Sequence, residues 1–148
     1  MGTGGALKLA KEAIRGRFLL LYGDLYRTFD YSHLLTRREG NVLAVYPYTE
    51  GLTTIACANV GLDAAQDRVR QYRKNDPGAG LTHVDAGFGV FRLDVLELLP
   101  QGISSFENVV YPNLAQRGCL GAERVDRHFL DIGNPADLAH ARAHPPLS

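Results

Sequence analysis

The chain has 148 residues, of which 45% are hydrophobic and 22% are charged, and its formal net charge is zero. That length and apolar content are typical of one domain with a core of its own, so we expect a single domain over residues 1–148. The balanced charge argues against a nucleic-acid or membrane partner, and two cysteines are too few for a disulfide scaffold or a zinc site. With no apolar stretch near the ~20 residues of a membrane span and no signal peptide, we expect a cytoplasmic protein.

The first predicted element follows a short glycine-rich segment, Gly2-Thr3-Gly4-Gly5. Apolar residues at helical spacing then predict a helix from about Gly5 to Ile14. A glycine-rich loop that leads straight into a helix is expected to connect a strand to that helix, and no strand precedes this one. We therefore expect the chain to be cut on its N-terminal side; the alternative explanation of the glycines is a frayed terminus or a cloning remnant, which the Ala6-Leu7 continuation argues against.

The next predicted element is a buried strand, Phe18–Tyr22, which emerges into a loop at Gly23-Asp24. Sheets of α/β proteins place ligands at the ends of such strands. A carboxylate there, beside a glycine that lets a ligand come close, suits a Mg²⁺ ion that arrives with a phosphate. Asp24 is therefore a candidate metal ligand, and the alternative is an ordinary turn residue.

The middle of the chain alternates between predicted strands and short helices. Asp30 is expected to cap a short helix, and Glu107 is expected to be the capping-box partner of a later one. The predicted strands are Val42–Tyr48, Ile55–Val60, Val69–Arg73 and His83–Phe91, and the predicted helices are Leu93–Leu99 and Ser105–Gln116. This alternation predicts an α/β fold with a mixed sheet.

The chain ends with a predicted pair of strands, Leu120–Val125 and His128–Ile132, and a helix from Pro135 to Ala143. Asp131 lies inside the second strand, between Leu130 and Ile132. A carboxylate in such a place is expected to be partly buried and to need a cation or hydrogen bonds. Asp131 is thus a second candidate metal ligand, which would share one ion with Asp24 if the fold brings the strands together; the alternative is an acid that begins the last helix.

Four segments, in this order, resemble the sugar-phosphate nucleotidyltransferases, and most of all those that act on heptose or hexose 1-phosphates. They are Gly2-Thr3-Gly4-Gly5-Ala6, Leu21-Tyr22-Gly23-Asp24, Asp85-Ala86-Gly87 and Phe129-Leu130-Asp131-Ile132-Gly133-Asn134-Pro135. The resemblance covers almost the whole chain. It implies a Rossmann-like fold with a mixed, mainly parallel sheet flanked by helices, of which this chain would be the C-terminal two-thirds, with the first strands missing.

The resemblance also implies a reaction and a set of site residues. In this family a sugar 1-phosphate attacks the α-phosphate of a nucleoside triphosphate, giving a nucleotide-sugar and pyrophosphate with the help of Mg²⁺. By resemblance, Asp24 and Asp131 bind the metal, and the Gly2, Thr3, Gly4 and Gly5 segment meets the base and ribose. Asp85 and Gly87 match positions that face the sugar, and Lys74 matches a lysine that pairs with the sugar phosphate.

The chain also departs from the family. The glycine-rich Gly-x-Gly-Thr-Arg motif and the Pro-Lys-Pro motif that hold the triphosphate do not occur in it. Three interpretations follow: an enzyme completed by a separately encoded N-terminal piece, a non-catalytic subunit that binds a sugar phosphate or nucleotide-sugar, or a truncated and inactive gene product. An upstream reading frame that encodes the missing motif would separate them.

Overall fold

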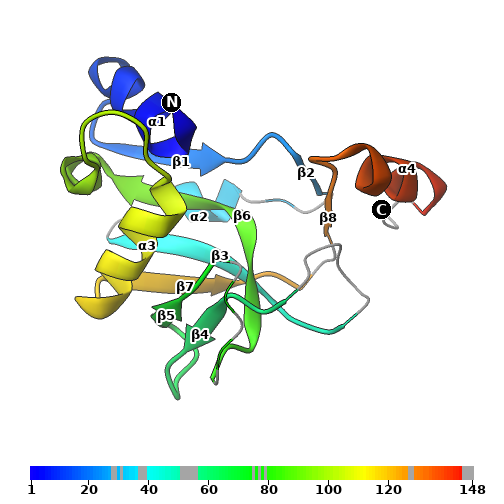
Figure 1. Ribbon diagram of the computed structural model, residues 1–148. Helices are drawn as coiled ribbons and strands as arrows, with labels where there is room; N and C mark the ends of the chain where they lie inside the picture. The colour runs from blue at the N-terminus through cyan, green and yellow to red at the C-terminus, as the bar shows by residue number, and fades with distance from the viewer. Residues whose placement is uncertain are drawn as a thin grey trace.

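A computed structural model of the chain describes residues 1–27, 30, 32–36, 40–50, 57–74, 76, 78, 80–126 and 129–144. Its centre is a six-stranded sheet in the order β5-β4-β6-β3-β7, with β1 also paired to β6 (Figure 1). These strands are β1 (Arg17–Leu21), β3 (Asn41–Pro47), β4 (Val60–Leu62), β5 (Val69–Tyr72), β6 (His83–Arg92) and β7 (Leu120–Arg124). The α/β class and the mixed sheet predicted from the sequence are confirmed.

The long strand β6 determines how the sheet pairs. It runs antiparallel to β1, β3 and β4, so these three point the same way, as does β7, which is parallel to β3. Among the described strands, β3–β7 is therefore the one parallel pairing. Four strands, β1, β3, β4 and β7, run in the same direction, as expected for a mainly parallel sheet. Their hydrogen-bonded pairing is mostly antiparallel, because β6 lies between β3 and the strands β1 and β4.

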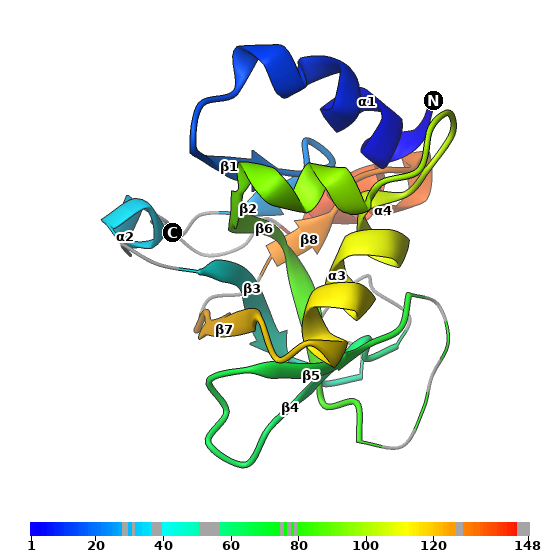
Figure 2. The same cartoon turned by 90° about the vertical axis from the view of Figure 1, so that its left-hand side faces the viewer.

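Helices cover both faces of this sheet, and β3 shows why. Its alternate residues face opposite ways: Leu43 and Val45 pack in one core cluster, Val42 and Ala44 in the other. The first cluster is covered by the helix α3 (Phe106–Gln116) and the 3₁₀ helix η2 (Leu93–Leu98), and the second by α2 (Ser32–Thr36). Figure 2 shows α2 and α3 on opposite sides of β3 and β7.

A two-stranded ribbon lies beside the main sheet. It joins β2 (Leu25–Arg27) to β8 (Phe129–Asp131), and helix α4 (Pro135–Ala143) follows it (Figure 1). The predicted pairing of the last two strands with each other is wrong: β7 joins β3 and β8 joins β2. Strand periodicity indicates that a strand exists but not which neighbour it takes, since pairing depends on long-range contacts.

The N-terminal segment also differs from its prediction. Helix α1 spans Gly2–Ala10 and a 3₁₀ turn follows at Lys11–Ala13, so the four residues expected to form a loop lie inside the helix. The glycines permit close packing against a later segment: the Gly4 amide donates to the Ser104 carbonyl at 2.9 Å, and a Cβ on Gly4 would lie 2.5 Å from Ser104 Oγ. Local glycine content predicted a loop, whereas this tertiary contact favours a helix.

The remaining local predictions are largely confirmed. Asp30 accepts a hydrogen bond from the Ser32 amide at 2.8 Å at the start of α2, and α4 begins at Pro135 and ends at Ala143 as predicted; its N-cap is Asn134. The predicted strand Ile55–Val60 lies partly outside the described residues, and β4 begins at Val60. Within the part of the chain that the structure describes, no helix is both long and apolar enough to cross a bilayer.

Candidate functional site

Asp24 and Asp131 lie side by side at one end of the β2–β8 ribbon. Asp131 pairs with Leu25 across the ribbon, and the Ile132 amide donates to the Asp24 carbonyl at 2.7 Å. A side chain added at Gly133 would place its Cβ 3.0 Å from Asp131 Oδ1 and 3.3 Å from Asp24 Oδ2. The sum of these distances sets an upper bound of 6.3 Å on the separation of the two oxygens. A Mg²⁺ ion bound directly by both, with each oxygen about 2.1 Å away, would need them within about 4.2 Å of each other, and a metal-bound water would extend that reach.

The donor set at this point fits a magnesium ion. Mg²⁺ is commonly held by one or two carboxylates together with water and substrate phosphates, and not by a cage made only of protein ligands. Gly133 leaves the space between the carboxylates free of a side chain, and its amide already donates to Asp131 Oδ1 at 2.7 Å. Among the described residues there is no group of three or more His, Cys, Asp or Glu side chains suited to a metal, so any ion here would depend on this pair.

A second group of polar residues gathers where α1, β5 and α3 meet. Glu107, in the first turn of α3, accepts a hydrogen bond from Lys74 Nζ at 3.1 Å on Oε1, and from Thr3 Oγ1 at 2.7 Å and Ser105 Oγ at 2.6 Å on Oε2. Its side chain is 7% exposed, and that of Lys74 is 41% exposed. Glu107 thus joins Thr3 and Lys74, two residues that the sequence had singled out.

The sequence had suggested a different role for Glu107. The N-cap of α3 is Ser105, whose hydroxyl accepts from the Asn108 amide at 3.2 Å. A capping-box glutamate would lie three residues after the N-cap, at position 108, and Glu107 lies one residue before that position. Its carboxylate contacts Thr3 and Lys74 as well as the cap residue. Burial raises the pKa of Glu107, but the hydrogen bonds from Ser105 and Thr3 and the charge of Lys74 outweigh it and hold the pKa at about 2.

Asp85 and Gly87 lie together on β6. The Asp85 carboxylate is buried and accepts from the Gly87 amide at 2.8 Å, while the Asp85 amide donates to Asn59 Oδ1. Burial raises the pKa of Asp85 to about 7; the Gly87 hydrogen bond and the charge of Lys74 act against that rise, and the charge of Glu107 adds to it. Asp85 therefore lies within electrostatic reach of the Lys74–Glu107 pair.

Gly87 brings these residues close to the aspartate pair. Its carbonyl accepts from the Tyr22 amide at 2.9 Å, two residues before Asp24. Its φ is +71°, and a Cβ there would lie 1.7 Å from Leu25 Cδ1, so a larger residue would be strained at this φ and would displace the Leu25 side chain. The structure thus brings Asp24, Asp85, Gly87 and Asp131 together around β6 and the ribbon, and it joins Thr3 and Lys74 through Glu107. Gly2, Gly4 and Gly5 pack instead against the segment at Gly102–Ser104. The roles of all these residues remain predictions.

Three tyrosines at this site were missed by the sequence analysis. Tyr72 and Tyr111 are buried with their rings 4.9 Å apart, edge to face, and burial is the largest cause of the raised pKa of each. Tyr72 also interacts with Asp85 through a hydrogen bond. The Tyr22 and Tyr111 hydroxyls influence each other's pKa, but within the part of the chain that the structure describes neither has a partner at good hydrogen-bonding geometry. Tyr22 lies in the Leu21-Tyr22-Gly23-Asp24 motif, but its hydroxyl was given no role; Tyr72 and Tyr111 have the local pattern of any core aromatic, so no sequence signal marks them.

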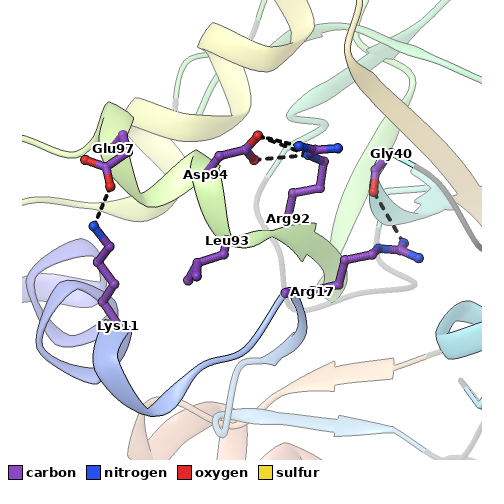
Figure 3. Close-up of a pocket in the computed structure, with 8 residues that line it drawn as sticks. Lys11, Arg17, Gly40, Arg92, Leu93, Asp94 and Glu97 are labelled. Carbon is purple, nitrogen blue, oxygen red and sulfur yellow. Dashed lines mark hydrogen bonds and ion pairs between the residues drawn. The ribbon is translucent and has the colours of Figure 1, made fainter.

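A pocket lies elsewhere and does not involve this chemistry. It has a volume of about 780 Å³ and lies between Lys11, Arg17, Arg92 and Glu97, whose side chains are drawn in Figure 3. Arg17 begins β1 and Tyr22 follows its end, which places the pocket about 16 Å from the site along the strand. Its charges are paired with one another, Lys11 with Glu97 and Arg92 with Asp94 at 2.8 Å. Size alone does not make it the functional site.

Comparison with known proteins links this geometry to a group of enzymes. No protein-family model matches the chain. It is 24% identical over 149 residues to mannose-1-phosphate guanyltransferase beta-B of Xenopus laevis, and 24% identical to the mannose-1-phosphate guanylyltransferase catalytic subunit beta of Danio rerio. Each match covers 93% of this chain and 39% of the relative. The chain thus spans about two fifths of the length of these curated relatives.

Solved structures share the fold. HddC from Yersinia pseudotuberculosis superposes with a TM-score of 0.73 at 23% identity, over 95% of this chain and 60% of that one. A putative glucose-1-phosphate thymidylyltransferase from Bacillus anthracis gives a TM-score of 0.73 at 16% identity, over 96% and 60% of the two chains. The fold is that of the nucleotidyltransferases. The chain is similar in sequence and in fold to sugar-phosphate nucleotidyltransferases, which confirms the resemblance seen in its motifs.

Proposed function

We propose that this chain carries the metal-binding and sugar-phosphate-binding part of a sugar-phosphate nucleotidyltransferase. The observation that carries the proposal is the convergence of Asp24 and Asp131 at Gly133, from segments more than a hundred residues apart in the sequence. The similarity to mannose-1-phosphate guanylyltransferases supports it. HddC has also been solved in complex with GMP-PN, a nucleotide ligand, on the same fold.

In the proposed reaction, an oxygen of the sugar 1-phosphate attacks the α-phosphorus of a nucleoside triphosphate, the bond to the bridging oxygen breaks, and pyrophosphate leaves. Transfer of this kind depends on positioning and on neutralising phosphate charge. When bound by Asp24 and Asp131, Mg²⁺ would supply part of that neutralisation. Lys74 would pair with the sugar phosphate, Asp85 and Gly87 would face the sugar, and the Gly2–Gly5 turn of α1 would adjoin the nucleotide.

The first test concerns the aspartate pair. Asp24→Asn and Asp131→Asn are each expected to weaken Mg²⁺-dependent binding of GDP-mannose at least tenfold, because each removes one of two charged ligands. The double variant should be little worse than either single one, since both residues serve one ion. Isothermal titration with and without Mg²⁺ measures this. Additive losses, or equal binding in EDTA, would contradict a shared metal site.

A non-catalytic binding subunit remains the alternative function. The same site residues would serve it, because binding a sugar phosphate or a nucleotide-sugar needs no transfer of a nucleotidyl group. Both functions predict GDP-mannose binding, and they differ in turnover once a segment bearing the Gly-x-Gly-Thr-Arg and Pro-Lys-Pro motifs is supplied. Turnover on that addition supports the enzyme, and binding that stays without turnover supports the subunit.

A further inference from the structure

Glu107 has more hydrogen-bonding partners than the cap of α3 needs. Ser105 already caps the helix through its own hydroxyl, which accepts from the Asn108 amide. Yet Glu107 is nearly buried and both of its carboxylate oxygens are engaged, by groups that come from α1, from the end of β5 and from the cap residue. Burying a carboxylate is unfavourable unless its charge is matched, so the cluster calls for an explanation beyond helix capping.

The three hydrogen-bond donors to Glu107 are divided between its two carboxylate oxygens. The hydroxyls of Thr3 and Ser105 both donate to Oε2, and this leaves Oε1 directed at Lys74 Nζ. Thr3 is itself held, because its hydroxyl accepts from the Phe106 amide at 2.9 Å. The carboxylate is therefore fixed from two sides before it meets the lysine, and its low pKa keeps it ionised at neutral pH.

We propose that Glu107 is a positioning residue that fixes the ammonium group of Lys74 for a sugar phosphate and connects it, through Thr3, to the first turn of α1. This inference rests on the proposed function, in which Lys74 pairs with that phosphate. A lysine side chain is long and flexible, and a single charged partner restricts it. The ammonium group has three N–H donors, so one bond to Glu107 leaves two for phosphate oxygens.

Glu107 links the segment proposed to bind the nucleotide with the lysine proposed to bind the sugar phosphate. Thr3 belongs to the segment proposed to adjoin the nucleotide, and Lys74 to the segment proposed to meet the sugar phosphate. Glu107 is bonded to both. A movement of α1 on nucleotide binding would therefore shift the position of Lys74. The substitution Glu107→Gln should remove this coupling between α1 and Lys74.

The experiment combines a measurement on the free protein with ligand titrations. ¹⁵N relaxation of Lys74 Nζ reports the order of the ammonium group without any ligand. Titrations with mannose 1-phosphate and with GTP, both in Mg²⁺, report affinity at each end. In Glu107→Gln we expect a lower order parameter at Lys74 and about tenfold weaker binding of mannose 1-phosphate, because a charge-assisted bond is lost. GTP affinity should change by less than about twofold.

Matched variants separate positioning from general loss of structure. Lys74→Met should weaken mannose 1-phosphate as much as Glu107→Gln, and the double variant should be no weaker. Glu97→Gln removes the carboxylate of an exposed Lys–Glu pair far from the site and should change neither measurement. If Glu107→Gln fails to fold, Thr3→Val removes one of the hydroxyls that hold the carboxylate; it should lower the Lys74 order parameter, and Thr3→Ser should restore it.

The outcomes separate the inference from the function beneath it. If mannose 1-phosphate binds the wild-type protein but Glu107→Gln changes neither its affinity nor the order of Lys74, the positioning role is overturned and the proposed function stands. If neither ligand binds the wild-type protein, the proposed function fails. In that case the ¹⁵N order parameter of Lys74 Nζ in Glu107→Gln and in Thr3→Val still tests whether Glu107 fixes the ammonium group. An order parameter that is unchanged in both variants would overturn the positioning role as well.

Discussion

At the scale of single residues, Asp85 and Glu107 are both nearly buried acids but their pKa values move in opposite directions. For Asp85, burial dominates and raises the pKa to about 7. For Glu107, burial is outweighed by two hydroxyl donors and the charge of Lys74, and the pKa is about 2. The two carboxylates differ both in depth, since Asp85 is the more deeply buried, and in the hydrogen bonds and charge that stabilise the ionised form of Glu107.

These opposite shifts predict opposite effects of pH on stability. The raised pKa of Asp85 means that its contribution is fully present below its ordinary pKa of 3.8 and is lost as pH rises to about 7. The lowered pKa of Glu107 means that its contribution is present above its ordinary pKa of 4.5 and is lost as pH falls to about 2. Asp85→Asn should therefore remove a decline in the free energy of unfolding between pH 4 and 7, on the order of a few kcal/mol.

Urea denaturation at intervals from pH 2 to 8 measures both effects. Relative to the wild-type protein, Asp85→Asn should gain stability as pH rises towards 7. Glu107→Gln should be the less stable protein at pH 6, and this deficit should shrink towards pH 2. Parallel curves for the wild type and Asp85→Asn across pH 4–7 would show that Asp85 titrates alike in the folded and unfolded states.

At the scale of elements, the β2–β8 ribbon brings the aspartates together. Leu25 pairs with Asp131, and the Ile132 amide bonds to the Asp24 carbonyl, so both acids are held by the backbone of the same short ribbon. Gly133 follows, and its lack of a side chain keeps the space between the two carboxylates open. In the proposed site, the ribbon would supply both carboxylate ligands and the space for an ion.

The substitution Gly133→Ala tests whether an ion needs the space beside the Asp24 and Asp131 carboxylates. The added methyl group would lie 3.0 Å from Asp131 Oδ1 and 3.3 Å from Asp24 Oδ2, where it would push the carboxylates apart or occupy the position of the ion. We expect Mg²⁺ affinity to fall at least tenfold, with a change of less than about 1 kcal/mol in the free energy of unfolding, since the acids are exposed or half-buried and can move.

Gly23→Ala is the matched control for that substitution. Gly23 adjoins Asp24, but nothing lies within 4 Å of a Cβ added there. Isothermal titration with Mg²⁺ and a nucleotide should show unchanged affinity in this variant. Equal affinity in Gly133→Ala would indicate that the ion does not sit between the two acids.

At the scale of the whole molecule, the chain matches about two fifths of its curated relatives and 60% of HddC. We expect the 148-residue chain alone to release little or no pyrophosphate from any sugar 1-phosphate and nucleoside triphosphate. Each positioned donor to a transferring phosphoryl group is worth roughly 10²–10³ in rate, and the motifs that supply several of them do not occur in this sequence.

A coupled pyrophosphate assay checks this expectation, first with the purified chain and then with a segment bearing the Gly-x-Gly-Thr-Arg and Pro-Lys-Pro motifs, supplied as a fusion or as a separate polypeptide. Turnover should arise on that addition and should be lost again in Asp24→Asn. Robust release by the purified chain by itself would mean that other residues carry the chemistry.

Local structure was largely predictable from the sequence because it depends on neighbours in the chain. The strand at Phe18–Tyr22, the Asp30 cap, the helix that ends at Gln116 and the helix that begins at Pro135 follow from apolar patterning and from backbone amides that need partners. The motif order also indicated the family and brought forward Asp24, Asp131, Asp85 and Lys74 as candidates.

Only the tertiary structure decided which of these residues meet. The pairing of β8 with β2 and not with β7, the helical state of Gly2–Gly5 against Ser104, and the joining of Thr3 and Lys74 through Glu107 all depend on contacts across many residues. A carboxylate or tyrosine has the same local pattern whether it faces water or a buried partner. Its partner is set by the packing of distant elements, because burial and charge pairing are properties of the folded chain as a whole.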